Sequence, residues 1–88
     1  MKTPPFPGDR IELLHTFVRI VESGNLSAAA QRLDTTQPTV SRRLQALERL
    51  FGVRLLQRST HAITLTPDGE RCLAMARALI DEWEAMQE

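Results

Sequence analysis

The chain has 88 residues, 42% of them hydrophobic, and its 11 Lys and Arg balance 11 Asp and Glu. This number of residues fills one small domain and excludes a two-domain enzyme within them. No apolar run is long enough to span a membrane, and the first residues do not form an apolar signal segment. The single cysteine excludes an internal disulfide, so we expect a reducing compartment, the cytoplasm.

The zero net charge hides an uneven distribution along the sequence. Residues 1–66 carry nine basic and five acidic side chains, whereas residues 67–88 carry two basic and six acidic ones. Ten of the eleven basic residues are Arg, whose planar guanidinium suits phosphate and guanine. The sequence therefore predicts a basic body with an acidic tail. A solvated surface with a chance asymmetry is the open alternative.

Two helices are expected in the first third of the chain. Residues 1–8 contain three Pro and one Gly and predict an irregular lead-in. Asp9 is expected to cap a helix that ends near residue 22, and Asn25 a shorter helix that ends near Leu33. The first helix carries apolar residues at helical spacing: Ile11, Leu14, Phe17, Val18 and Val21.

A third helix is expected over about residues 37–51, after the tight turn at residues 34–36. Thr36 is its predicted N-cap, and Gly52 is expected to end it in a left-handed conformation. Its apolar side consists of Val40, Leu44, Leu47 and Phe51. Its opposite side carries no acid and consists of Pro38, Arg42, Gln45 and Arg49, flanked by Thr39, Ser41 and Ala46.

A hairpin and a last helix complete the predicted fold. Residues 53–58 and 62–66 are short, partly alternating segments on either side of a turn at residues 59–61. Thr66 and Pro67 start a helix that continues to the end of the chain. The predicted fold class is mainly α: a winged helix-turn-helix with a three-helix core and a small β-hairpin wing, followed by a long C-terminal helix. The expected parts are a flexible lead-in (1–8), the winged domain (9–66) and a linker helix for dimerisation (67–88).

The second and third helices predict a nucleic-acid contact. They are joined by a three-residue turn, and Ala29 and Ala30 in the second helix allow a close crossing; both features are typical of a DNA-binding helix-turn-helix. The third helix would enter a major groove, where Gln and Arg bind adenine and guanine edges. The hairpin would contact phosphate or a minor groove. Two alternatives stay open: a generic three-helix bundle with a solvated outer side, and a winged-helix module that binds a protein partner.

The last helix predicts a second contact. Its apolar residues recur at spacings of four, three, four and three, which forms a two-heptad seam: Cys72, Ala76, Leu79, Trp83 and Met86. We expect this seam to pair with the same helix of a second copy, giving a homodimer, while Leu73 and Ile80 pack on the first helix. In the alternative, the whole helix folds onto its own domain and Trp83 covers an edge of the core.

The sequence offers no arrangement of residues for catalysis. His15, His61 and Cys72 do not have the spacing of metal ligands, and neither a Gly-rich phosphate loop nor a nucleophile elbow occurs. We therefore expect no enzyme activity, no metal and no cofactor.

From residue 11 to about residue 80, the sequence resembles the N-terminal winged helix-turn-helix domain of LysR-type transcriptional regulators. The most diagnostic part is Gln37-Pro38 followed by Ser41-Arg42. The early Leu14 and Phe17 are also similar to the family pattern. Further stretches that carry the resemblance are NLSAAAQRL (25–33), Leu47-Glu48, GVRLL (52–56), Arg58-Ser59 and LTPDG (65–69).

The resemblance implies a set of contacts with DNA. Base contacts are expected from Gln37, Pro38, Thr39, Ser41 and Arg42. The resemblance implies phosphate contacts from Ser27 and Arg32. Apart from the resemblance, Thr36, Gln45 and Arg49 are also expected to contact phosphate. Wing contacts are expected from Arg58, Ser59, Thr60 and His61.

The resemblance also implies partners and a location. The partner would be double-stranded promoter or operator DNA with inverted-repeat half-sites, bound by a homodimer in the bacterial cytoplasm and nucleoid. A small-molecule effector is expected only if an effector domain belongs to the protein as well. This sequence departs from the family pattern at Thr35, where an aliphatic residue is usual, and at His61-Ala62, where basic residues are common in the wing.

Overall fold

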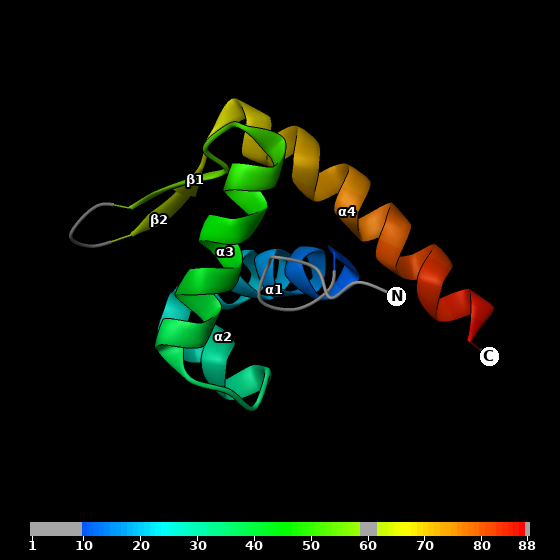
Figure 1. Cartoon of the computed structure of the whole chain (residues 1–88), viewed down its shortest axis with the longest axis horizontal. Helices are drawn as coiled ribbons and strands as arrows, with labels where there is room; N and C mark the ends of the chain where they lie inside the picture. The colour runs from blue at the N-terminus through cyan, green and yellow to red at the C-terminus, as the bar shows by residue number, and fades with distance from the viewer. Residues whose placement is uncertain (1–9, 59–61, 88) are drawn as a thin grey trace.

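The computed structural model describes residues 10–58 and 62–87, which form four helices and one two-stranded hairpin. In chain order these are α1 (Arg10–Ser23), α2 (Leu26–Arg32), α3 (Gln37–Phe51), β1 (Leu56–Arg58), β2 (Ile63–Leu65) and α4 (Pro67–Met86). Figure 1 shows α1 behind α3, the hairpin extending to one side, and α4 running away to the other. The predicted fold class, a winged helix-turn-helix followed by a long helix, is confirmed.

The core forms around α1, which packs against α2, α3 and α4. Its Leu13, Phe17 and Ile20 are fully buried and are the three largest side chains of the core with no exposure to water, so each removes a large apolar area from water on folding. The other helices complete this core with Ala29 and Ala30 from α2, Val40, Leu44 and Leu47 from α3, and Cys72, Ala76 and Ile80 from α4. The core therefore extends past residue 66, because the first half of α4 is built into the domain.

Side-chain caps fix where three of the helices begin. Asn25 accepts a hydrogen bond from the Ala28 amide at 2.7 Å, as predicted for an N-cap. The Thr36 and Thr66 hydroxyls accept from the third residue of their helices in the same way. The predicted Asp9 cap lies outside the described residues. Gly52 ends α3 with a φ of 73°, the left-handed conformation that was predicted.

The buried side of α3 differs from the prediction in its second half. Phe51 was expected in the core but is 47% exposed, whereas Ala46, expected beside the outer side, is fully buried. In the second half of α3, Ala46 and Leu47 are buried and Leu50 packs partly buried against the core. Phe51, at the last turn, therefore lies beyond the reach of the core.

The hairpin is shorter than predicted. Leu56 pairs with Leu65 and Arg58 with Ile63 in an antiparallel register. Residues 53–55 form no strand, and Leu55 is instead buried to 1% exposure. The predicted wing-tip residues Ser59, Thr60 and His61 lie outside the described residues.

The base of the hairpin is joined to the start of α4 by a compact set of contacts. The Thr66 hydroxyl donates to the Arg54 carbonyl at 2.6 Å, and the Thr66 amide donates to the Leu55 carbonyl at 3.0 Å. A Cβ atom on Gly69 would lie 2.0 Å from the Leu55 carbonyl oxygen, so only glycine fits there. This contact gives a physical reason for a glycine three residues after the capping threonine.

Candidate nucleic-acid interface

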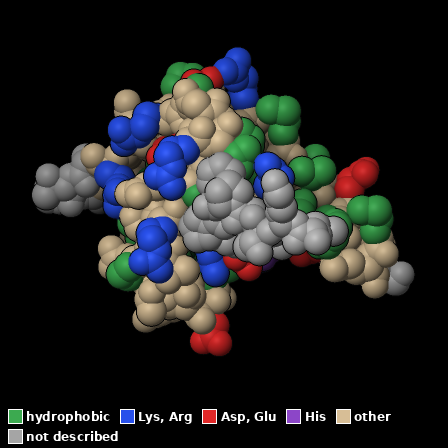
Figure 2. Space-filling model, in the orientation of Figure 1, with side chains coloured by type: hydrophobic (Ala, Val, Ile, Leu, Met, Phe, Trp, Pro, Cys, Tyr) green, Lys and Arg blue, Asp and Glu red, His purple; other side chains and the backbone are tan. Residues whose placement is uncertain are grey.

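The outer side of α3 is a solvent-exposed surface of basic and amide side chains. Gln37, Pro38, Arg42, Gln45 and Arg49 are exposed, and the only acid of this helix, Glu48, is turned aside and partly buried. Figure 2, viewed as in Figure 1, shows several Arg side chains over α3 and towards the hairpin. The helix can therefore present hydrogen-bond donors to an anionic, grooved partner without a carboxylate between them.

Hydrogen bonds join predicted DNA-contacting residues at the N-terminus of α3. The Arg42 guanidinium donates to the Thr39 hydroxyl oxygen at 3.3 Å, and the Thr36 hydroxyl donates to the same oxygen at 3.0 Å. The Ser27 hydroxyl donates to the Gln37 amide oxygen at 3.1 Å, which links α2 to α3. Because these side chains already hold one another, part of the entropy cost of ordering them on a ligand is met in the free protein.

The remaining predicted contacts lie at the edges of this surface. Ser27 and Arg32 are exposed on α2, while Thr39 and Ser41 on α3 are half-buried. Arg58 is exposed at the end of β1. Within the described residues, α2, α3 and the outer end of β1 thus all present predicted contact residues to solvent.

Arg43 has a different role from its neighbour Arg42. Its side chain is only 19% exposed, and it lies 3.5 Å from both the Glu12 carboxylate and the Thr16 hydroxyl of α1. The Thr16 hydroxyl in turn donates to the Glu12 carbonyl at 2.8 Å. Arg42 therefore faces solvent while Arg43 joins α3 to α1, because neighbouring positions on a helix point about 100° apart.

Glu48 was not assigned a role from the sequence. Its carboxylate accepts hydrogen bonds from the Leu55 and Leu56 amides, at 2.8 Å and 3.4 Å, and its side chain is only 14% exposed. Two sequence signals marked it: it is the single acid in a basic helix, four residues before Gly52, and it belongs to the Leu47-Glu48 pair that carries the family resemblance.

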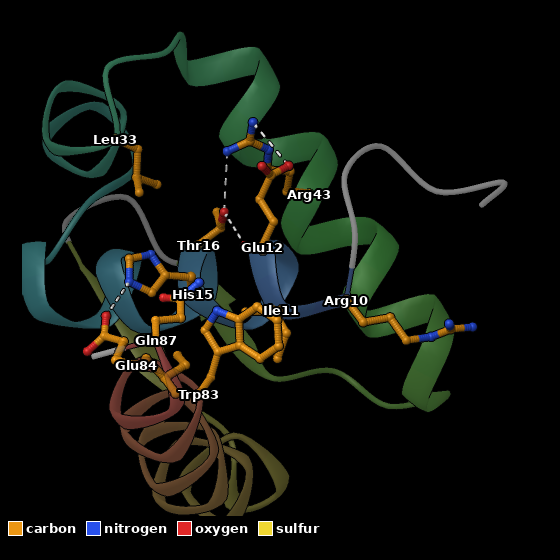
Figure 3. A pocket seen from close by; sticks show the side chains of 11 residues that line it. Arg10, Ile11, Glu12, His15, Thr16, Leu33, Arg43, Trp83, Glu84 and Gln87 are labelled. Atoms are coloured by element: carbon orange, nitrogen blue, oxygen red, sulfur yellow. Dashed lines mark hydrogen bonds and ion pairs between the residues drawn. The ribbon is translucent and has the colours of Figure 1, made fainter. Parts of the chain in front are cut away.

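A cavity of about 570 Å³ lies between α1 and the C-terminal half of α4 (Figure 3). Among the side chains that line it, Arg43 forms an ion pair with Glu12, and the His15 Nε2 lies 4.0 Å from a Glu84 carboxylate oxygen across the two helices. None of the described residues that line it belongs to the predicted base or phosphate contacts. The cavity and the outer side of α3 are therefore separate features.

The predicted seam of α4 needs correction. Cys72 and Ala76 are 9% and 2% exposed, so they belong to the core of their own chain and are not available to a partner helix. The exposed apolar stripe consists of Met75, Leu79, Trp83 and Met86. The heptad spacing misled because the body of the domain ends before α4 does, so one side of the helix is buried at first and exposed later. Ile80 and Leu73 pack on the core, as predicted.

The surroundings of Cys72 suit a structural residue. Burial raises the pKa of the Cys72 thiol above its ordinary value, which lowers the fraction of reactive thiolate. Among residues 10–58 and 62–87, no three His, Cys, Asp or Glu side chains are grouped to hold a metal ion. Over the same residues, no helix has the length and hydrophobicity needed to cross a membrane.

Comparison with known proteins identifies related sequences and structures. The family of bacterial regulatory helix-turn-helix proteins called lysR matches residues 11–70. The transcriptional regulator TcbR of Pseudomonas sp. (strain P51) is 44% identical over 68 residues, covering 77% of this chain and 23% of TcbR. The transcriptional activator AllS of Klebsiella pneumoniae is 44% identical over 72 residues, covering 82% of this chain and 25% of AllS. The chain thus spans about a quarter of the length of these curated relatives.

Two solved structures extend the comparison to DNA complexes. The CbnR DNA-binding domain in complex with DNA superimposes with a TM-score of 0.85 and 38% identity, over 90% of this chain and 91% of that one. The BenM DNA-binding domain in complex with catB site 1 DNA gives a TM-score of 0.84 and 32% identity, over 89% of this chain and 84% of that one. Both matches extend over nearly the whole of this chain.

Proposed function

The chain belongs to the lysR family of bacterial regulatory helix-turn-helix proteins, as a DNA-binding domain, and we propose that it reads a specific duplex sequence with the outer side of α3. The observation that carries this proposal is the exposed, acid-free row of Gln37, Arg42, Gln45 and Arg49. Gln and Arg can each make two hydrogen bonds to a base edge in a major groove. Similar domains are known in complex with DNA, which supports DNA as the partner of this surface.

The proposed contacts divide by chemistry. Gln37, Thr39 and Arg42, with Pro38 and Ser41, meet base edges. The phosphate backbone is met by Ser27, Arg32, Thr36, Gln45 and Arg49, and by Arg58 of the hairpin with the adjoining wing residues 59–61. Phosphate contacts fix the register of the protein on the duplex, and base contacts select the sequence.

The proposed assembly is a dimer of this domain. The exposed stripe of Met75, Leu79, Trp83 and Met86 supports pairing with the same helix of a second copy, since such a row is otherwise left in water. A symmetric pair would bind an inverted repeat with half-sites about one helical turn apart, or a multiple of that distance. The whole protein would then act as a transcription regulator in the bacterial cytoplasm, binding rather than catalysing, with any effector bound by a part outside this domain.

Selection from a random pool of duplexes, followed by binding at several salt concentrations, tests the function. We expect an enriched motif and an affinity that falls with salt as counterions are released from phosphates. Arg42→Ala should cost about 1–3 kcal/mol of binding free energy and relax one base position. Arg49→Ala is the matched control on the same side of α3, and it should weaken every sequence alike. Absence of binding to any duplex at low salt would instead favour the rival, a winged-helix module for a protein partner.

A further inference from the structure

We propose that Glu48 is a positioning residue for DNA binding, because its carboxylate holds the hairpin in place against the recognition helix α3. The inference rests on the proposed function, in which α3 and the hairpin contact DNA together. It concerns how the two elements are held at a fixed angle, and it gives a role to a side chain that does not reach DNA itself.

The geometry begins at the end of α3. The Gly52 amide donates to the Glu48 carbonyl at 2.8 Å, and the left-handed Gly52 reverses the chain. The reversed chain returns to the Glu48 side chain, whose Oε2 accepts from the Leu55 amide at 2.8 Å and the Leu56 amide at 3.4 Å. The main-chain carbonyl and the side-chain carboxylate of Glu48 therefore both accept hydrogen bonds from the segment that leads into β1.

Charge and burial favour this role over a solvated surface acid. A carboxylate in the last turn of a helix is disfavoured by the helix dipole, and a side chain that is 14% exposed loses much of its hydration. The two amides supply the compensating hydrogen bonds. Arg54 adds little, because its Nε lies 3.8 Å from the same oxygen and its side chain is 73% exposed.

The same segment has a second, independent anchor on α4. Thr66 bonds to the Arg54 and Leu55 carbonyls, and Gly69 packs directly on the Leu55 carbonyl. Loss of the Glu48 carboxylate would therefore leave the hairpin attached to α4, and Leu55 and Leu56 in the core, but remove the hydrogen bonds that fix its angle to α3. The expected defect is a hairpin that is folded yet held at no fixed angle to the recognition helix.

A double-mutant cycle on DNA binding tests this proposal. Arg58→Ala, Glu48→Ala and the double variant are compared by the slope of log affinity against log salt on one selected duplex. Arg58→Ala should lower the magnitude of this negative slope by about one, because one phosphate contact is lost. Glu48→Ala should lower it by a similar amount, and the double variant should be no lower than either single variant. The slope reports contacts made by folded molecules, so a smaller folded fraction does not change it.

Matched variants separate the possible outcomes. Glu48→Gln keeps an acceptor at the same length and should retain most of the wild-type slope. Glu48→Asp draws the carboxylate back by one methylene, and it replaces Glu48→Ala in the cycle if the latter does not fold. Arg32→Ala, on α2, should add fully to either Glu48 variant.

Two results would overturn the inference, and they differ in what else they affect. If Arg58→Ala lowers the slope but Glu48→Ala leaves it unchanged, or the two effects add fully, the hairpin is held without Glu48 and the proposed function stands. If Arg58→Ala has no effect on the slope, the hairpin contact of the proposed function fails and the inference fails with it.

Discussion

Helices α3 and α4 are both amphipathic, but they differ in how much of their apolar side is buried within the chain. On α3 the apolar residues Val40, Leu44 and Leu47 are buried within the chain, so the polar outer side is what remains for a partner. On α4 the apolar residues Cys72, Ala76 and Ile80 are buried in the same way, while Leu79 and Trp83 stay 49% and 42% exposed. One helix therefore offers hydrogen-bond donors and the other offers apolar area. The two surfaces suit different classes of partner.

The strongest test of this comparison is at Gly69, whose close contact with the Leu55 carbonyl packs the start of α4 against the rest of the domain. Gly69→Ala should destabilise the fold by about 3 kcal/mol or more, because the new methyl group meets backbone that cannot move aside alone. Urea unfolding followed by circular dichroism measures the change. Gly24→Ala is the matched control: its site is open, and only its φ of 86° is unfavourable, at a cost of about 1 kcal/mol. Equal losses in the two variants would contradict the close contact with Leu55.

A second test concerns the two ends of the apolar side of α3. Leu47→Ala should cost about 2–5 kcal/mol of unfolding free energy, because Leu47 is fully buried among core side chains. Phe51→Ala should cost less than about 1 kcal/mol, since Phe51 is largely exposed. Thermal unfolding of both variants decides the point. A larger loss of unfolding free energy for Phe51→Ala than for Leu47→Ala would mean that Phe51 is buried, as expected from the sequence.

Phe51 also shows where sequence periodicity stops being informative. The caps at Asn25, Thr36 and Thr66 could be predicted because each depends on a side chain and the next three residues. The exposure of Phe51 and the burial of Cys72 within its own chain could not, because both depend on where the neighbouring helices end, and periodicity gives only the side of a helix. The outer side of α3 was predictable because all its members lie on one regular element.

The contacts that the sequence did not reveal join residues distant in the chain or require a reversed backbone. Glu48 bonds to amides seven and eight residues later, after a left-handed turn. Arg43 reaches Thr16, 27 residues away. Periodicity within one helix contains no information on either contact, and an Arg or Glu on a helix is usually solvated.

A third test probes the exposed end of α4. Trp83→Ala should weaken self-association by about tenfold, since truncating a large aromatic at the centre of an interface commonly costs more than about 1 kcal/mol. Sedimentation over a range of concentrations measures this, and the unfolding free energy at low concentration separately measures the contacts that Trp83 makes within its own chain. Ala74→Ser is the control on the same helix, because Ala74 is exposed but lies off the apolar stripe. A wild-type chain that is monomeric at every concentration would remove the proposed pairing.

The smallest expected effect is at Cys72, and it distinguishes the buried half of α4 from the exposed half. Because burial raises the pKa of the Cys72 thiol in the folded chain, folding favours the protonated form. The stabilisation is fully present below the pKa of the unfolded thiol, about 8.5, and is lost as the pH rises through the folded value. We expect slow reaction with a thiol reagent at neutral pH and a gradual loss of stability in alkali.

The control is the double variant Cys72→Ala and Ala78→Cys. Its single thiol lies at an exposed position and should react at the rate of a free thiol. Equal rates for the two thiols at neutral pH would mean that α4 separates from the core over its first half as well, and the contrast between its two halves would disappear.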